Sequence, residues 1–126
     1  MGATYITVAN NIIQGGGPAS TISGPNTNAT WTDNILFNTT GAGDMPAGSY
    51  KNIDPKLVKD SNGEYHLLKG SPAVNAATGK FPSLTVDMDG QQRTSPLDVG
   101  ADEVSNAKVA AHILKAPDVG AATGSK

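Results

Sequence analysis

The residues of this chain whose types and spacing could hold a cation lie in the segment D-M-D-G, which begins at Asp87. Two aspartates followed by a glycine resemble the start of a calcium loop, where alternate oxygen-bearing side chains and a sharp turn surround the ion. The twelfth position from Asp87 is Asp98, a carboxylate where such loops carry glutamate. Its fifth position carries an amide, Gln91. We therefore favour a structural turn at Asp89 and Gly90, and keep a calcium site of Asp87, Asp89 and Asp98 as the alternative.

Arg93 follows this segment and could bind a carboxylate in a bidentate manner. Asp87, Asp98 and Asp102 are its candidate partners. Such a clamp would fix the last turn of the fold. We predict that Arg93 is structural and not catalytic.

The remaining candidates for chemistry lack a pattern. His66 and His112 are far apart in the sequence, and we expect His66 to be hydrogen-bonded or to face solvent. Trp31 and Tyr50 could stack on sugar rings, but Trp31 aligns with Val8 in a repeat, so a packing role is equally open. We find no serine nucleophile motif, phosphate loop or thiol. The sequence therefore predicts no catalytic residue.

Composition excludes several classes of function. The net charge is −2, and the charges are scattered, so no basic stripe indicates nucleic-acid binding. No stretch approaches the roughly 18 apolar residues that a membrane span needs. The chain has 15 glycines and 8 prolines but only 5% aromatic residues, which favours short strands and many turns.

The elements that must position these residues begin with a repeat. T-V-A-N-N-I-I-Q-G, from Thr7, resembles T-W-T-D-N-I-L-F-N, which starts 23 residues later. In this alignment Asn11 matches Asn34 and Ile12 matches Ile35. This period fits one turn of a parallel β-solenoid, in which equivalent residues stack as an asparagine ladder and an aliphatic stack. We therefore predict an all-β, right-handed, single-stranded parallel β-helix, with a chance similarity in a β-sandwich as the alternative.

The second half of the chain holds a series of turn and strand signals. An N-G turn at residues 60–63 precedes a strand at residues 64–68, and Ala73 is expected to pack in a narrow part of the core. Residues 98–103 are expected to form the last strand, with Gly100 allowing close approach of another segment. A short helix is expected at residues 106–115.

Residues 52–104 contain, in order, the blocks N-I-D-P-K-L-V, G-E-Y-H-L, G-S-P-A, D-M-D-G-Q-Q-R and D-V-G-A-D-E. This series resembles the terminal turns of bacterial secreted parallel β-helix proteins, and within them polysaccharide lyase family 6, the chondroitinase B-like and alginate lyases. The tail L-K-A-P-D-V-G from Leu114 is a partial match to that family, because its proline is displaced and Ala121 stands in place of the final proline.

The resemblance implies terminal β-helix turns over residues 1–104 and a capping segment with a loose tail over residues 105–126. It implies a parent protein that cleaves uronic acid polymers, alginate or glycosaminoglycan, by β-elimination, with calcium as cofactor and a secreted or periplasmic bacterial location. The family's catalytic stretch lies upstream of this signature, so no catalytic residue is carried over to this chain. Asn11, Asn34, Asp89, Gly90, Arg93, Asp98 and Gly100 are then structural.

Two alternatives stay open. The chain could be a self-standing module that binds glycans or associates with itself, or a half that reassembles with missing N-terminal turns. Both the fragment and the split half would leave strand edges unpaired near Tyr5–Ile13. We therefore predict a partner there, either the missing turns or a second copy. Nucleic acid and membranes are not predicted partners.

Overall fold

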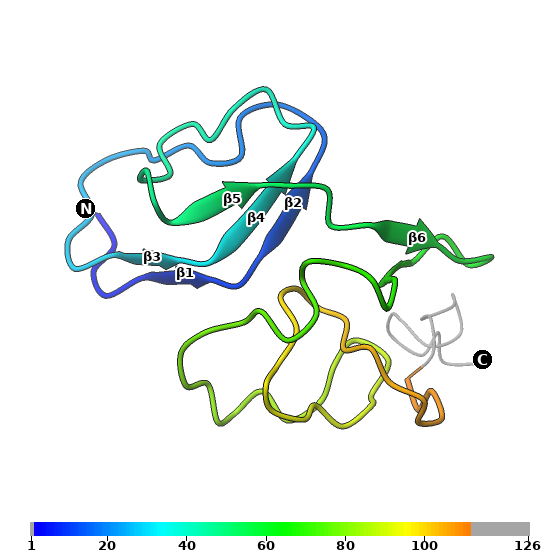
Figure 1. The fold of residues 1–126 in the computed structure, drawn as a ribbon. Helices are drawn as coiled ribbons and strands as arrows, with labels where there is room; N and C mark the ends of the chain where they lie inside the picture. The colour runs from blue at the N-terminus through cyan, green and yellow to red at the C-terminus, as the bar shows by residue number, and fades with distance from the viewer. Residues whose placement is uncertain (1, 112–126) are drawn as a thin grey trace, which may run out of the picture.

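The computed structural model describes residues 2–111. Its regular elements are seven short strands, and no helix occurs among the described residues, so none there is long and apolar enough to cross a membrane. The chain order places a strand-rich N-terminal half before a half built mainly of turns (Figure 1). The strands are β1 (Thr7–Ala9), β2 (Ile12–Gln14), β3 (Thr30–Thr32), β4 (Asn34–Phe37), β5 (Tyr50–Asn52), β6 (Leu57–Lys59) and β7 (Tyr65–Leu67).

The predicted N-terminal repeat is present in the register that the sequence indicated. β1 pairs with β3 in parallel, with Thr7 opposite Thr30, and β2 pairs with β4, with Ile12 opposite Ile35. Isolated parallel bridges join Thr4 to Thr27 and Pro18 to Gly41, which keeps the same offset on both sides. We call residues 4–18 the first repeat unit and residues 27–41 the second. They lie side by side over their whole length.

The asparagine ladder also forms as predicted. The side chain of Asn11 donates from Nδ2 to Asn34 Oδ1 at 2.9 Å, and the Asn11 backbone N–H donates to the same oxygen at 3.1 Å. Asn34 is fully buried and donates from Nδ2 to the carbonyls of Val8 (3.1 Å) and Ser49 (3.2 Å). All the hydrogen-bonding capacity of this amide is used where the chain turns between strands. The ladder therefore fixes the register of the two units.

The prediction of a right-handed parallel β-helix is wrong. The sheets contain only two or three strands, in the orders β1-β3, β2-β4-β5 and β6-β7, and they form neither a closed nor a solenoid-like stack. β5 pairs with β4 through Tyr50 and Asn34, a spacing of 16 residues in place of 23, and β3 has no third strand beside it. A solenoid needs every strand to recur at a constant period. The shortened third segment breaks that period.

The antiparallel hairpin of β6 and β7 is the second departure. Val58 lies opposite His66, and the turn between the strands closes with Asp60 N–H donating to the Glu64 carbonyl at 2.8 Å. Gly63 has a φ of +87°, which the sequence anticipated for this N-G turn. Because such a turn returns the chain onto the preceding strand, β6 and β7 pair with each other and not with the repeat units.

Residues 70–104 form what we call the closing segment, a series of turns that lies against the first repeat unit (Figure 1). The predicted turn at Asp89 and Gly90 is present, with Gly90 at a φ of +73° and an antiparallel bridge between Val86 and Gln92. The predicted last strand at 98–103 is wrong, because Gly100 has a φ of +104° that interrupts extended pairing. Residues 106–111 of the predicted helix are not helical, and the remainder lies outside the described residues.

One apolar cluster joins the two halves. Ile35 of the second repeat unit packs with Leu67, Ala73 and Val99 of the C-terminal half, and Ile12 lies against them. Gly100 comes so close that a Cβ atom there would stand 2.9 Å from Ile12 Cδ1. Close approach at Gly100 and packing of Ala73, which is fully buried, were both expected from the sequence.

Candidate functional site

The conserved-looking acidic blocks of the closing segment converge below the core, where their carboxylates are buried. Asp98 is 3% exposed and accepts backbone N–H groups from Asn75 and Val104, each at 2.7 Å. Asp87 accepts from Gln91 at 2.8 Å and from Glu103 at 3.1 Å. Charge-assisted bonds of this kind are strong in a buried setting. These carboxylates therefore act as acceptors that hold turns together.

Arg93 belongs to the same network, but its partners differ from those expected. Its guanidinium lies 3.6 Å from Glu103 Oε2, and it donates to the carbonyls of Gly100 (2.6 Å) and Asp98 (3.4 Å). The predicted pairing with a carboxylate of Asp87, Asp98 or Asp102 is wrong. Arg93 is structural, as predicted, because it fastens the loop of residues 98–103 from the inside.

Burial has a measurable consequence at Glu103. Its removal from water raises the pKa of the carboxyl group, and the nearby charge of Asp98 adds to that rise. Its Oε2 accepts the Asp98 backbone N–H at 3.0 Å, so Asp98 and Glu103 are fixed relative to each other.

The most distinctive group of side chains surrounds His66 on β7. His66 Nδ1 lies 3.3 Å from Asp102 Oδ1 and 3.4 Å from Asp89 Oδ2, and His66 Nε2 lies 3.1 Å from Asp60 Oδ2. We call these four residues the His66 cluster. The three elements that meet here are the β6–β7 hairpin, the D-M-D-G turn and the loop of residues 98–103. No spacing in the sequence indicated this meeting.

The charges of the cluster act on one another. Burial alone would lower the pKa of His66, but hydrogen bonds to Asp60 and Asp102, and the charges of Asp102 and Asp89, raise it above its ordinary value. Burial raises the pKa of Asp89, and the negative charges of Asp87 and Asp102 contribute to the rise. The site therefore favours a positive charge near Asp89.

Asp60 lies at the solvent side of the ring. Backbone hydrogen bonding from Glu64, followed by contact with His66, lowers its pKa. Its Oδ1 also accepts N–H groups of Asn62 (2.8 Å) and Glu64 (2.9 Å), which fixes the carboxylate in the hairpin turn. Asp60 is therefore held in place to orient the imidazole.

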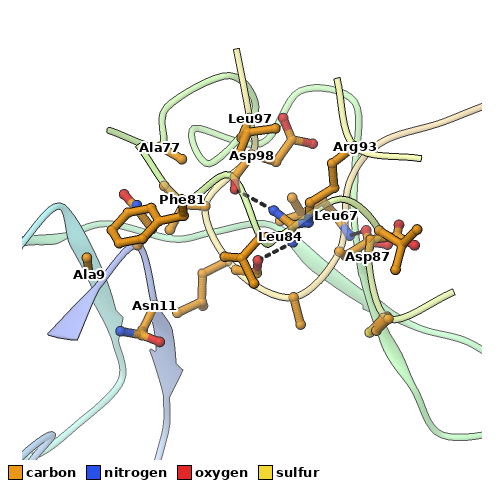
Figure 2. A pocket seen from close by; sticks show the side chains of 18 of the residues that line it. Ala9, Asn11, Leu67, Ala77, Phe81, Leu84, Asp87, Arg93, Leu97 and Asp98 are labelled. Carbon is orange, nitrogen blue, oxygen red and sulfur yellow. Dashed lines mark hydrogen bonds between the residues drawn. The ribbon is translucent and has the colours of Figure 1, made fainter. Parts of the chain in front are cut away.

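A pocket of about 630 Å³ lies between the first repeat unit and the closing segment. Figure 2 shows Ala9 and Asn11 at one side, Arg93 at the other, and Phe81 and Leu84 between them. Most of the lining side chains are apolar, and no lysine lines the pocket within the part of the chain that the structure describes. The pocket offers little of the hydrogen bonding that a sugar chain needs.

The sugar-stacking candidates are not brought to this pocket. Trp31 lies on β3 and Tyr50 on β5, in different sheets, and both are half-buried. His112 lies outside the described residues. Of the candidate calcium ligands, Asp89 lies in the His66 cluster, whereas Asp87 and Asp98 bind backbone N–H groups. The turn therefore does not gather all three carboxylates into the metal-ligand group that the structure offers.

No protein-family model, no curated protein and no solved structure matches this chain.

Proposed function

We propose that this chain is the non-catalytic C-terminal portion of a secreted or periplasmic bacterial protein that processes carbohydrate, a polysaccharide lyase acting on uronic acid polymers by β-elimination. The proposal starts from the ordered series of blocks in residues 52–104, which resembles the ends of family 6 lyases. In the parent, calcium and the catalytic residues belong to the stretch that precedes this signature.

The observation that carries the structural role is the fate of the acidic blocks. Asp87, Asp98 and Glu103 are 8%, 3% and 4% exposed, and their carboxylate oxygens accept backbone N–H groups. A general base or acid must reach a proton on the substrate. Carboxylates enclosed in this way are suited to stabilising turns and not to proton transfer.

β-Elimination also needs a base near the uronate C5 proton. Every lysine of the described residues is exposed, and Arg93 is occupied by Glu103 and by backbone carbonyls. This arrangement supports a chain that stabilises an enzyme without contributing to its reaction.

The test begins with an antibody raised against the purified chain. In the culture medium of the source bacterium, it should precipitate a longer polypeptide that converts alginate or a glycosaminoglycan into products with the ultraviolet absorbance of unsaturated uronates. The purified chain alone should form no such product. A precipitated polypeptide of the chain's own length, without lyase activity, would overturn the proposal, as would activity of the chain alone.

Self-association is a second candidate, and the Tyr5–Ile13 edge favours it. Tyr5 is 80% exposed and Ile6 is 36% exposed, and β1 has a neighbouring strand on one side only. The edge is open only in part, because Gly100 N–H donates to the Asn10 carbonyl at 2.9 Å. Sedimentation at several concentrations tests this candidate: a dimer that Tyr5→Ser abolishes would support it, and a monomer at all concentrations would exclude it.

A further inference from the structure

We propose that His66, Asp89 and Asp102 form a zinc-binding site that ties β7 to the closing segment. The inference goes beyond the proposed function, because a zinc site here would stabilise the fold whether or not the parent protein is a lyase.

The distances between the donor atoms suit one ion. His66 Nδ1 stands 3.3 Å from Asp102 Oδ1 and 3.4 Å from Asp89 Oδ2, and the three donor atoms lie within 4.8 Å of one another. A tetrahedral zinc ion with bonds of about 2.0 Å has ligand–ligand distances of roughly 3.3 Å. The separations from the imidazole nitrogen to both carboxylates therefore match the edges of such a tetrahedron.

The far side of the ring supplies a separate observation. His66 Nε2 lies 3.1 Å from Asp60 Oδ2. A carboxylate accepts hydrogen bonds and cannot donate them when ionised, so this contact places a proton on Nε2. Metal-binding histidines commonly donate their second ring N–H to a carboxylate, which orients the ring and increases its basicity. Asp60 occupies that position.

This arrangement leaves Nδ1 facing two acceptors. A neutral imidazole carries one N–H, and the contact with Asp60 uses it. Nδ1 then turns its lone pair toward the carboxylates of Asp89 and Asp102, whose side chains are only 12% and 10% exposed. Three acceptors around one point repel each other unless a cation lies between them. Either a second proton on the ring or a metal ion relieves this repulsion.

The carboxylates are held in place before any ion binds. Asp102 Oδ2 accepts the Leu67 backbone N–H at 2.7 Å, which leaves Oδ1 directed at His66. Asp89 is fixed through its backbone, since its N–H donates to Asp87 Oδ1 at 3.0 Å. Ligands ordered by the fold lose little conformational freedom when they bind an ion.

The mixture of donors selects among metals. Calcium and magnesium take oxygen ligands, and calcium takes six to eight of them. One imidazole nitrogen with two carboxylate oxygens suits zinc, and a water molecule would complete the tetrahedron.

Isothermal titration of the chelator-treated chain with zinc chloride tests the site. We expect one zinc per chain, abolished by His66→Gln and retained by His112→Gln, which changes the other histidine of the sequence. Asp60→Asn should weaken binding by about ten- to hundredfold, as loss of an orienting carboxylate does elsewhere. The matched control is Asp54→Asn, because Asp54 likewise accepts a local backbone N–H, from Lys56 at 2.7 Å.

Cobalt provides a readout that does not depend on stability. Cobalt bound to the chain should show the intense visible absorption of a tetrahedral site, and zinc should displace it. Because Asp60 is exposed in the hairpin, Asp60→Asn keeps the test valid if His66→Gln does not fold. The absence of zinc binding would overturn the proposal, as would binding that survives His66→Gln or is lost in His112→Gln. The second proton on His66 would then be the charge that the cluster requires.

Discussion

Asn10 and Thr78 are 68 residues apart in the sequence and form two reciprocal hydrogen bonds. Asn10 Nδ2 donates to the Thr78 carbonyl at 2.7 Å, and the Thr78 backbone N–H donates to Asn10 Oδ1 at 3.0 Å. The amide of Asn10 thus acts as a peptide group would in a strand pair. Together with the Gly100 bond to the Asn10 carbonyl, it attaches the closing segment to the first repeat unit.

Asn10→Gly tests this attachment. Asn10 has a φ of +57°, which glycine adopts without strain, so the variant removes the side-chain bonds alone. We expect a loss of about 1–2 kcal/mol in the free energy of unfolding, measured by urea denaturation. The control is Asn28→Gly, at an exposed residue with a φ of +55°, which should leave stability unchanged or slightly raised. Equal effects at the two positions would contradict the attachment.

Asn34→Asp tests the asparagine ladder. The substitution keeps the shape but replaces the Nδ2 donor with an acceptor that faces the carbonyls of Val8 and Ser49. We expect a loss of roughly 2–4 kcal/mol at neutral pH, because a buried group becomes both charged and unpaired. Thermal and urea unfolding measure it. Stability equal to that of the original chain would show that the ladder does not fix the register.

Gly100→Ala tests the close approach to Ile12. The added Cβ would stand 2.9 Å from Ile12 Cδ1, and the φ of +104° disfavours any side chain. We expect destabilisation of about 1–3 kcal/mol. Ile12→Val removes the clashing Cδ1 and should recover part of this loss in the double variant, measured as a coupling energy. Purely additive losses would mean that the backbone conformation, and not the contact, is responsible.

Asp33 links the second repeat unit to Thr78 and predicts a pH dependence. Hydrogen bonds from Thr32 and then Thr78, and the charge of Lys51, lower the pKa of Asp33. A carboxyl group whose pKa is lower in the folded state contributes stability above its unfolded pKa, and this contribution disappears as the pH falls through the folded pKa. Carbon-detected NMR titration should therefore give Asp33 a lower pKa than Asp54. Thr78→Val should raise the pKa of Asp33, and an unchanged pKa in that variant would contradict the link.

The local parts of this fold were predictable because they depend on matching residues or on single turns. Asn11 and Asn34, like Ile12 and Ile35, occupy equivalent places in two similar segments, so their pairing followed from alignment. The constant period did not extend further, because β5 returns after 16 residues. The N-G turn before β7 joins two short strands locally, and this local pairing prevailed over stacking on the repeat units.

The candidate site was less predictable, because it depends on contacts between distant turns. His66 and Asp102 are separated by 36 residues, and no periodicity relates them. Arg93 was correctly expected to be structural, but its carboxylate partner is Glu103, because the loop of residues 98–103 folds back at Gly100 instead of extending as a strand.

The structural role of the buried acidic blocks is the central claim, and the urea unfolding of Asp98→Asn tests it most directly. Asp98 is 3% exposed and accepts two backbone N–H groups, whereas asparagine keeps only one acceptor oxygen. We predict a loss of about 2–3 kcal/mol relative to the original chain, with Asp54→Asn near zero. An Asp98→Asn variant as stable as the original would contradict the claim that these carboxylates hold the closing segment together.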